Sequence, residues 1–173
     1  MQAPTHILAG VIINRLFKWK NYKAVGLLLT FICCLFMHGF FDKLGRMVYQ
    51  PEANFNDPFW LIYHVLMGLA TVVLLYIFWR DYKWGIIFSL LPEIDWLVIG
   101  VQHLFNFKIS FYEVPWLHFT LNYVLDQIPL FNRLDLLPDN RSNPWACIPE
   151  LILIGVLVLI FRAMVRYRKN IHF

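Results

Sequence analysis

The sequence predicts an all-α integral membrane protein, a helical bundle with about four transmembrane helices, a short N-terminal helix and an outer interfacial helix. Composition supports this fold class. The 173 residues are 60% hydrophobic and 15% charged, and the mean hydropathy is +0.57, whereas soluble domains are about 45–50% apolar and about a quarter charged. The basic residues also cluster beside the apolar runs, where they set topology. One transmembrane domain over residues 1–173 is expected.

The apolar runs give the expected helices in chain order. The first segment, 6–19, is too short to span upright, since a span needs about 20 residues, so a short or tilted helix is expected. Pro58 begins one of the longer runs, and a tight polar turn is expected at 80–83. The expected spans are 24–41, 58–79, 84–103 and 146–164.

Basic clusters give the expected orientation. They are 15–23, 80–83 and 162–169. Cytoplasmic loops carry an excess of Lys and Arg, and alternating spans place all of these clusters in the cytoplasm. The connections 42–57 and 104–145 then face outward, and the second contains an expected interfacial helix near 116–128. We expect a protein of the bacterial inner membrane that contacts membrane lipid. The net charge of +4 lies in these clusters and does not indicate nucleic-acid binding.

An acidic stretch, Leu90-Leu91-Pro92-Glu93-Ile94-Asp95-Trp96, interrupts the expected span 84–103. A charge near the bilayer centre costs at least a few kcal/mol unless it faces a partner or a wet cavity. Pro92 also removes a backbone hydrogen bond that neighbouring groups must replace. Glu93 and Asp95 are therefore expected to serve a function.

Histidines and carboxylates on separate expected helices share one depth in the outer half of the membrane. His38 and Asp42 are four residues apart and lie on one helix face. His64 and Asp95 each lie about 9–10 Å below the outer end of their helices at 1.5 Å per residue. His6 is at the outer end of the first helix. Inward-pointing side chains of these types build the metal sites of helical bundles.

The predicted site is a divalent metal centre. Imidazole with carboxylate suits zinc, iron or manganese, and zinc is the first expectation. A catalytic zinc keeps one position for water and lowers the pKa of that water, and a nearby carboxylate can take the proton. The predicted metal ligands are His6, His38, His64 and Asp95. The predicted catalytic or supporting carboxylates are Glu93 and Asp42.

Structural interpretations stand beside these roles. A lone histidine in a membrane helix can hydrogen-bond across a helix pair, Asp42 can be a juxtamembrane charge, and Glu93 can pair with a lysine. Farther on, His118, Asn122 and Asp126 form a polar stripe at i, i+4 and i+8, typical of an amphipathic interfacial helix. We expect this stripe to face water. The alternative is that the helix covers the site and contributes His118.

Short motifs resemble those of the predicted membrane-bound metal-dependent hydrolases. The matching residues are Thr5, His6 and Gly10 in T-H-x-x-x-G, Pro92, Glu93 and Asp95 in L-P-D-x-D-H, and His38 and Asp42 in H-x-x-x-D. Glu93 replaces the first Asp of the second motif, Trp96 replaces its His, and no H-R-x-x-T-H-S occurs. The resemblance implies a small integral membrane protein with metal-dependent hydrolase activity.

Alternative functions follow from the same residues. The first is a membrane-embedded metal-dependent hydrolase that acts on a lipid or lipid-linked ester or phosphoester at the outer leaflet. The second is a non-catalytic accessory subunit of a larger membrane complex, with histidines that are structural or ligate haem or chlorophyll. The third is a proton- or ion-coupled carrier that uses Glu93 and Asp95 in a broken helix. Metal content and co-purifying partners distinguish the first two.

Overall fold

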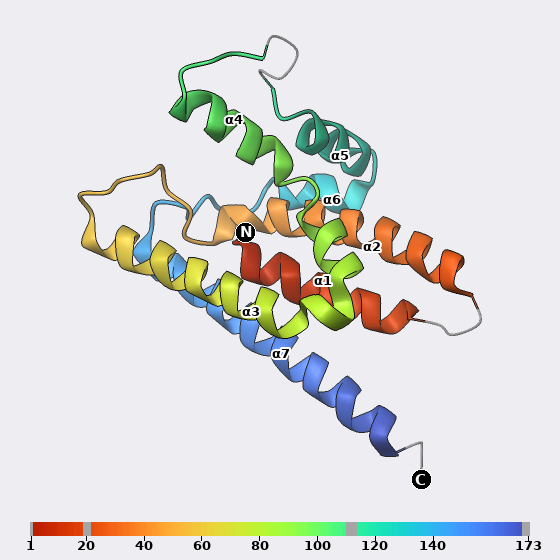
Figure 1. Cartoon of the computed structure of the whole chain (residues 1–173). Helices are drawn as coiled ribbons and strands as arrows, with labels where there is room; N and C mark the ends of the chain where they lie inside the picture. The colour runs from red at the N-terminus through yellow and green to blue at the C-terminus, as the bar shows by residue number, and fades with distance from the viewer. Residues whose placement is uncertain (1, 19–21, 110–113, 171–173) are drawn as a thin grey trace.

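The computed structural model describes residues 2–18, 22–109 and 114–170, and this part of the chain contains helices and no strands (Figure 1). The elements are α1 (Ala3–Phe17), α2 (Lys23–Leu44), η1 (Gly45–Met47), α3 (Pro58–Leu90), α4 (Ile94–Leu104), α5 (Trp116–Asp126), α6 (Pro129–Leu134), η2 (Pro144–Ala146) and α7 (Cys147–Asn170). The expected helical fold class is confirmed.

The short first helix forms the centre of the bundle. Every residue of α1 from Pro4 to Asn14 is buried, and the helix packs against α2, α3 and α7. A helix that is apolar on all sides is stable only when other elements surround it. Its length and composition therefore suit a core helix better than a tilted span.

Three helices are long and apolar enough to cross a membrane, at Lys23–Met47, Pro58–Leu90 and Pro144–Tyr167. Large apolar side chains on their outer faces are exposed, for example Val72, Tyr76 and Leu159. Exposed apolar surface over a whole span is compatible with membrane insertion. The described residues contain fewer such helices than the expected number of about four.

The expected span 84–103 is wrong, because its first part belongs to α3 and its second part is a separate helix. The chain bends at Tyr82, where φ is −131° and ψ is 24°. The helix then continues to Leu90 without an intervening loop (Figure 1). The expected polar turn at 80–83 is thus a kink within a continuous helical segment.

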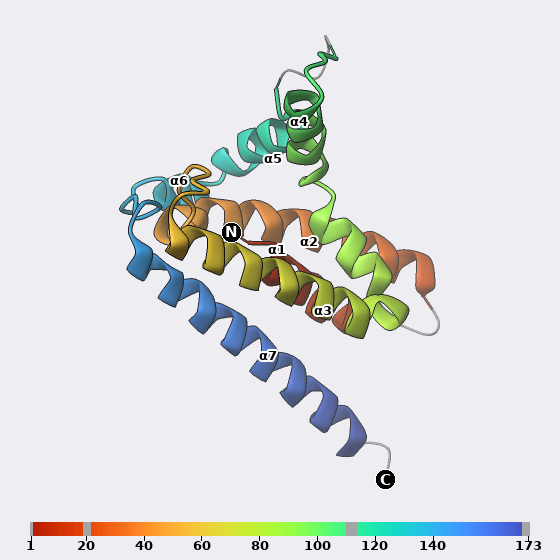
Figure 2. The same cartoon turned by 60° about the vertical axis from the view of Figure 1, so that its left-hand side comes forward.

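The helix stops at Leu90 because of Pro92. The amides of Glu93, Ile94 and Asp95 donate hydrogen bonds to the carbonyls three residues earlier, at 3.0, 3.2 and 3.1 Å. These turn bonds replace the longer-range bonds of an α-helix, which proline interrupts. The helix α4 then leaves in a new direction and stands out from the bundle (Figure 2), whereas α5 packs against α2.

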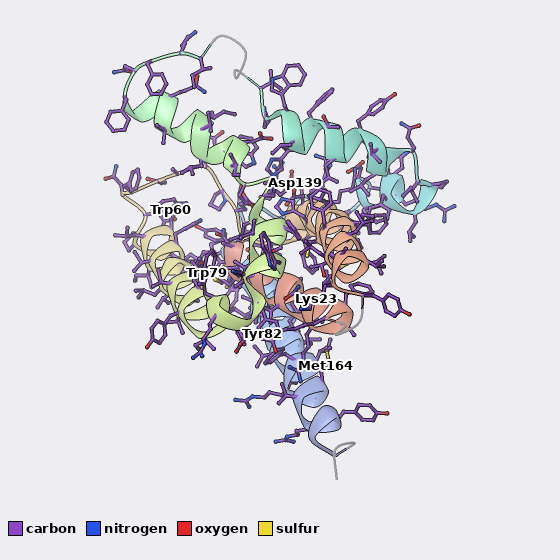
Figure 3. The ribbon with its side chains drawn as sticks, turned by 45° about the vertical axis from the view of Figure 1, so that its right-hand side comes forward. Lys23, Trp60, Trp79, Tyr82, Asp139 and Met164 are labelled. Atoms are coloured by element: carbon purple, nitrogen blue, oxygen red, sulfur yellow. The ribbon has the colours of Figure 1, made fainter. Side chains whose placement is uncertain are left out.

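The predicted basic clusters meet at one end of the bundle. Arg15 Nη1 donates to the Tyr82 hydroxyl at 2.6 Å, Arg15 Nη2 donates to the Met164 carbonyl at 3.5 Å, and Lys18 Nζ donates to the Asp81 carbonyl at 3.1 Å. Figure 3 shows Tyr82 and Met164 at this end. Lys20 and the side chains of 168–169, which belong to the predicted clusters, lie outside the described residues.

The connections between helices meet at the opposite end. The amide of Tyr49 donates to the Ala146 carbonyl at 3.1 Å, and the amide of Gln50 donates to the Arg141 carbonyl at 3.0 Å. Lys43 Nζ also pairs with Asp135 Oδ2 at 2.6 Å and with Asp126. These contacts attach α5, α6 and the start of α7 to the end of α2. They fix the segments that surround the candidate site.

Candidate metal centre

His6 is positioned by a buried carboxylate at the start of α1. Glu150 of α7 is fully buried and its Oε1 accepts from the Gln2 amide at 2.6 Å and from Thr5 Oγ1 at 3.0 Å. Its Oε2 accepts from the Tyr63 hydroxyl at 2.9 Å. A carboxylate at a helix N-terminus satisfies free amides and complements the helix dipole. This anchor sets the rotation of α1 and so directs His6.

Gly10 of α1 lies where α1 and the end of α3 approach each other closely. A Cβ at Gly10 would lie 2.6 Å from Ser89 Oγ and would overlap the Gly85 carbonyl. Glycine is required here because the segment after the Tyr82 kink approaches the backbone of α1 directly. That segment carries the Ser89 carbonyl, which holds the next histidine of the site.

His38 of α2 presents one ring nitrogen to the centre. Its Nδ1 lies 2.7 Å from the Ser89 carbonyl oxygen. A carbonyl accepts and cannot donate, so in the neutral ring Nδ1 carries the hydrogen and Nε2 carries a lone pair. A metal-binding histidine is commonly oriented by such a bond from its other nitrogen. His38 is buried, and its Nε2 faces the remaining members of the cluster.

His118 of α5 is oriented in the same way from the opposite side. Asp95 Oδ2 accepts from the His118 amide at 2.9 Å and lies 3.3 Å from His118 Nδ1. Asp95 is fully buried. Because an ionised carboxylate only accepts, the hydrogen of His118 belongs on Nδ1 and its Nε2 carries a lone pair. Asp95 therefore orients the His118 ring through the nitrogen that faces away from the centre.

The centre brings together atoms that all carry lone pairs. His38 Nε2 lies 3.3 Å from His118 Nε2, and Asp42 Oδ2 lies 3.2 Å from His38 Nε2 and 3.6 Å from His118 Nε2. One proton can bridge only one of these pairs. A tetrahedral zinc with bonds of about 2.0–2.1 Å separates its ligand atoms by about 3.3–3.5 Å. The observed spacing fits a metal cation.

His6 and Glu93 close the cluster. His6 Nε2 lies 3.6 Å from Asp42 Oδ1 and 3.9 Å from Glu93 Oε1, and Glu93 Oε1 lies 4.0 Å from His38 Nε2. Both ring nitrogens of His6 are buried and make no hydrogen bond within the described part of the chain. Among the described residues, two groups with metal-binding spacing share His38: His6, His38 and Asp42, and His38, Glu93 and His118.

Glu93 differs from the other members because it is partly accessible. The exposed fraction of its side chain is 34%, against 19% for Asp42. Burial raises the pKa of the Glu93 carboxyl, and the charge of Asp42 acts in the same direction. A carboxyl whose pKa is displaced toward neutrality can exchange a proton with a bound water.

A pocket of about 1350 Å³ joins the centre to the surface, and Asp42, Glu93 and His118 line it. One side of the pocket is polar, with Gln50, Glu52 and Arg141. The other side is apolar, with Trp96, Leu97 and Phe119 from α4 and α5. A ligand with a polar group and an apolar part fits these two walls.

The structure brings together most of the side chains that the sequence predicts for the site. His6, His38, Asp42 and Glu93 meet in the cluster. Asp95 lies behind His118, so it contacts a candidate ligand and not the centre itself.

His64 lies apart from the cluster. Its Nδ1 is 2.8 Å from the Trp60 carbonyl oxygen, and its ring stacks on the Trp60 ring at a centroid distance of 4.2 Å. Figure 3 shows Trp60 near the start of α3, away from α5. Depth along a helix was the only basis for including His64, and depth does not fix the direction of a side chain around the helix.

His118 occupies the place expected for His64. The expectation that its polar stripe faces water is wrong for His118, which is buried. The stripe exists, but α5 turns it toward α2, since Gly39 lets Leu121 and Leu125 pack closely against that helix. The i, i+4 pattern of the polar stripe could have identified His118, together with the Asp95 carboxylate within an apolar run, which predicts a polar partner.

Comparisons with known proteins add no assignment. No family model matches the chain, and neither the comparison with curated proteins nor that with solved structures gives a match. The resemblance in short motifs therefore stays a prediction, and the geometry of the cluster carries the functional argument.

Proposed function

We propose that this chain is a membrane-embedded metal-dependent hydrolase that acts on a lipid or lipid-linked ester or phosphoester at the outer leaflet. The observation that carries the proposal is the lone-pair cluster. His38, His118 and Asp42 face one another at 3.2–3.6 Å, and backbone and carboxylate bonds fix both histidines. A structural role in an accessory subunit gives no reason for carboxylates and unprotonated nitrogens to converge.

Zinc is the metal we propose first, because imidazole and carboxylate donors suit it and the spacing is near tetrahedral. His38, His118 and Asp42 would hold the ion, and His6 and Glu93 would lie beside it. A bound divalent metal supplies Lewis-acid polarisation and a water of lowered pKa. The bonds to the Ser89 carbonyl and Asp95 orient both histidines, so their Nε2 atoms would be available to a metal with little reorganisation.

Glu93 is the proposed general base. It lines the pocket and can accept a proton from a water that attacks the substrate. The water oxygen forms a bond to the carbonyl carbon or phosphorus, and the bond to the leaving oxygen breaks. Glu93 then returns the proton to that leaving oxygen, which balances the reaction.

The membrane location and orientation are part of the proposal. The helices that are long enough to span are Lys23–Met47, Pro58–Leu90 and Pro144–Tyr167. The basic end formed around Arg15 and Tyr82 would lie in the cytoplasm by the positive-inside rule. The pocket, lined by Gln50 and Arg141 of the opposite end, would then open at the outer side of a bacterial inner membrane.

Metal analysis tests the proposal. Detergent-purified wild type should contain about one zinc, iron or manganese per chain, and His38→Ala should lose it by elemental analysis. His64→Ala is the matched control, since His64 lies outside the cluster, and it should retain the metal. Stripping with a chelator should abolish ester or phosphoester hydrolysis, and adding back the metal should restore it.

The opposing outcomes are distinct. Full hydrolytic activity in metal-free protein would refute the metal-dependent mechanism. Metal-free, inactive wild type that co-purifies with larger membrane proteins would favour the accessory-subunit hypothesis. Equal loss of metal in His38→Ala and His64→Ala would show that the cluster is not the binding site.

A further inference from the structure

The helices α4 and α5 present a continuous apolar surface away from the bundle. Large side chains on this surface are well exposed, including Leu97 at 66%, Phe105 at 69% and Val124 at 55%. Exposed apolar patches of this kind occur where a protein meets a membrane or another apolar surface. The helix α4 stands out from the bundle (Figures 1 and 2), and α5 packs against α2 through Leu121 and Leu125. The exposed apolar side chains lie on the faces that do not contact the bundle.

Charged residues are absent from the outward surface of these two helices. Between Ile94 and Leu104 and between Trp116 and Asp126, the only Asp, Glu, Lys or Arg residues are Asp95 and Asp126. Asp95 is fully buried against His118, and Asp126 pairs with Lys43 of α2. Both carboxylates therefore have a partner within the protein, and the Asp126 side chain remains 42% exposed at the end of α5.

A lipid leaflet fits this surface better than a protein partner. Protein interfaces combine an apolar core with a polar rim and direct hydrogen bonds, whereas the large exposed side chains of α4 and α5 are apolar or aromatic, among them Leu97, Trp116 and Val124. Trp96 and Trp116 are half exposed, and tryptophan is enriched at the membrane–water interface. His118 and Asn122 of α5 line the pocket and Asp95 of α4 contacts His118. These polar side chains lie toward the centre, as the polar face of an interfacial helix lies away from lipid.

The same helices form a wall of the pocket. Trp96, Leu97 and Phe119 line it together with Glu93 and His118 of the cluster. A molecule that leaves the leaflet along α4 and α5 would therefore meet an apolar wall first. Its polar group would then reach the centre, between that wall and the polar side of the pocket.

We propose that α4 and α5 insert into the outer leaflet and that the substrate is a membrane lipid that enters the pocket from that leaflet. The acyl part lies along Trp96, Leu97 and Phe119, and the ester or phosphoester lies at the metal centre. This inference rests on the proposed hydrolase function. It predicts that turnover of a substrate in a bilayer depends on the apolar surface and that turnover of a soluble substrate does not.

The test compares a double variant with a matched control. Leu117→Glu/Val124→Glu places charges on the exposed surface of α5, outside the pocket lining, and Leu136→Glu places one on an exposed residue beyond α6. Reconstituted proteins are assayed on a soluble nitrophenyl ester or phosphate and on phospholipid vesicles. The double variant should keep soluble turnover within about twofold and lose at least tenfold on vesicles. Leu136→Glu should keep both.

A second measurement does not depend on activity. A fluorescent label at Val124→Cys, in a background with Cys33, Cys34 and Cys147 replaced by alanine, should be quenched by brominated lipid in vesicles. The same label at Leu136→Cys should be quenched by aqueous iodide. Iodide quenching at position 124 would overturn insertion. Shielding from iodide that rises with protein concentration, without quenching by lipid, would assign the surface to a second copy and overturn the proposal.

The outcomes separate this inference from the proposed function. Unchanged vesicle turnover in the double variant overturns lipid entry over α4 and α5 while the hydrolase function stands. Wild type that turns over neither substrate overturns the hydrolase and its lipid substrate, and the label still decides whether α5 inserts. Loss of both activities in the double variant, with label quenching by iodide, overturns the inference.

Discussion

Two buried polar clusters adjoin the first turns of α1, and they differ in how donors and acceptors are matched. Around Glu150, one carboxylate meets donors from Gln2, Thr5 and Tyr63 at 2.6–3.0 Å. On the other side of α1, imidazole nitrogens and carboxylates face one another at 3.2–4.0 Å. The first cluster is complete within the protein, whereas the second has an excess of lone pairs.

The comparison separates structural from chemical use of buried polarity. A buried carboxylate that meets several donors stabilises the fold at its own position. A cluster of imidazole nitrogens and carboxylates with few donors among them is stabilised when a cation binds. Substitutions around Glu150 should therefore change stability, and substitutions in the His–Asp–Glu cluster should change metal content or turnover.

The largest effect is expected for Glu93→Gln. The amide cannot take a proton, so turnover should fall by about 10²–10⁴-fold. Metal content should remain near that of wild type, because the two histidines and Asp42 stay in place. Parallel turnover and elemental analyses check this. Loss of metal in step with activity would instead make Glu93 a ligand.

A substitution in the other cluster should act on stability. Glu150→Ala leaves the Thr5 and Tyr63 hydroxyls and the Gln2 amide without their acceptor, which should cost about 3 kcal/mol. Thermal unfolding in detergent measures the loss. The fraction that stays folded should bind metal in the wild-type ratio, and a selective loss of metal would break the distinction between the clusters.

Asp95→Asn tests the support behind His118. The amide keeps an acceptor for the His118 ring but removes the charge, so metal affinity should fall about 10–100-fold. Competition with a chelator of known affinity measures this. The melting temperature of the metal-free protein should change little in comparison. An unchanged affinity would mean that His118 is not a ligand.

The smallest effect is expected for Tyr63→Phe. The change removes one of the donors to Glu150 at 2.9 Å, and the carboxylate keeps its other partners. Stability should fall by about 1 kcal/mol, with metal content and turnover unchanged. Chemical unfolding alongside the Glu150→Ala protein makes the two values comparable, and a larger loss here than in Glu150→Ala would contradict the assignment.

Periodicity and composition predicted the helices, but not how the middle of the chain is divided. Apolar residues from Trp84 to Val101 suggested one span, because hydropathy does not register a backbone break inside an apolar run. Pro92 and the kink at Tyr82 divide this region between α3 and α4. The sequence did not predict a role for Glu150, since the donors that surround a carboxylate at the start of an apolar helix come from other helices.

The sequence by itself determined the helical class, the apolar runs, the basic end and the inclusion of His6, His38 and the acidic stretch in one predicted site. These follow from local patterns, since hydropathy and charge act residue by residue along a helix. Only the tertiary structure decided that His118 joins the cluster, that Asp95 supports it and that His64 points elsewhere. Direction around a helix axis is set by packing against neighbouring helices, here at Gly10 and Gly39, and that packing involves residues far apart in the chain.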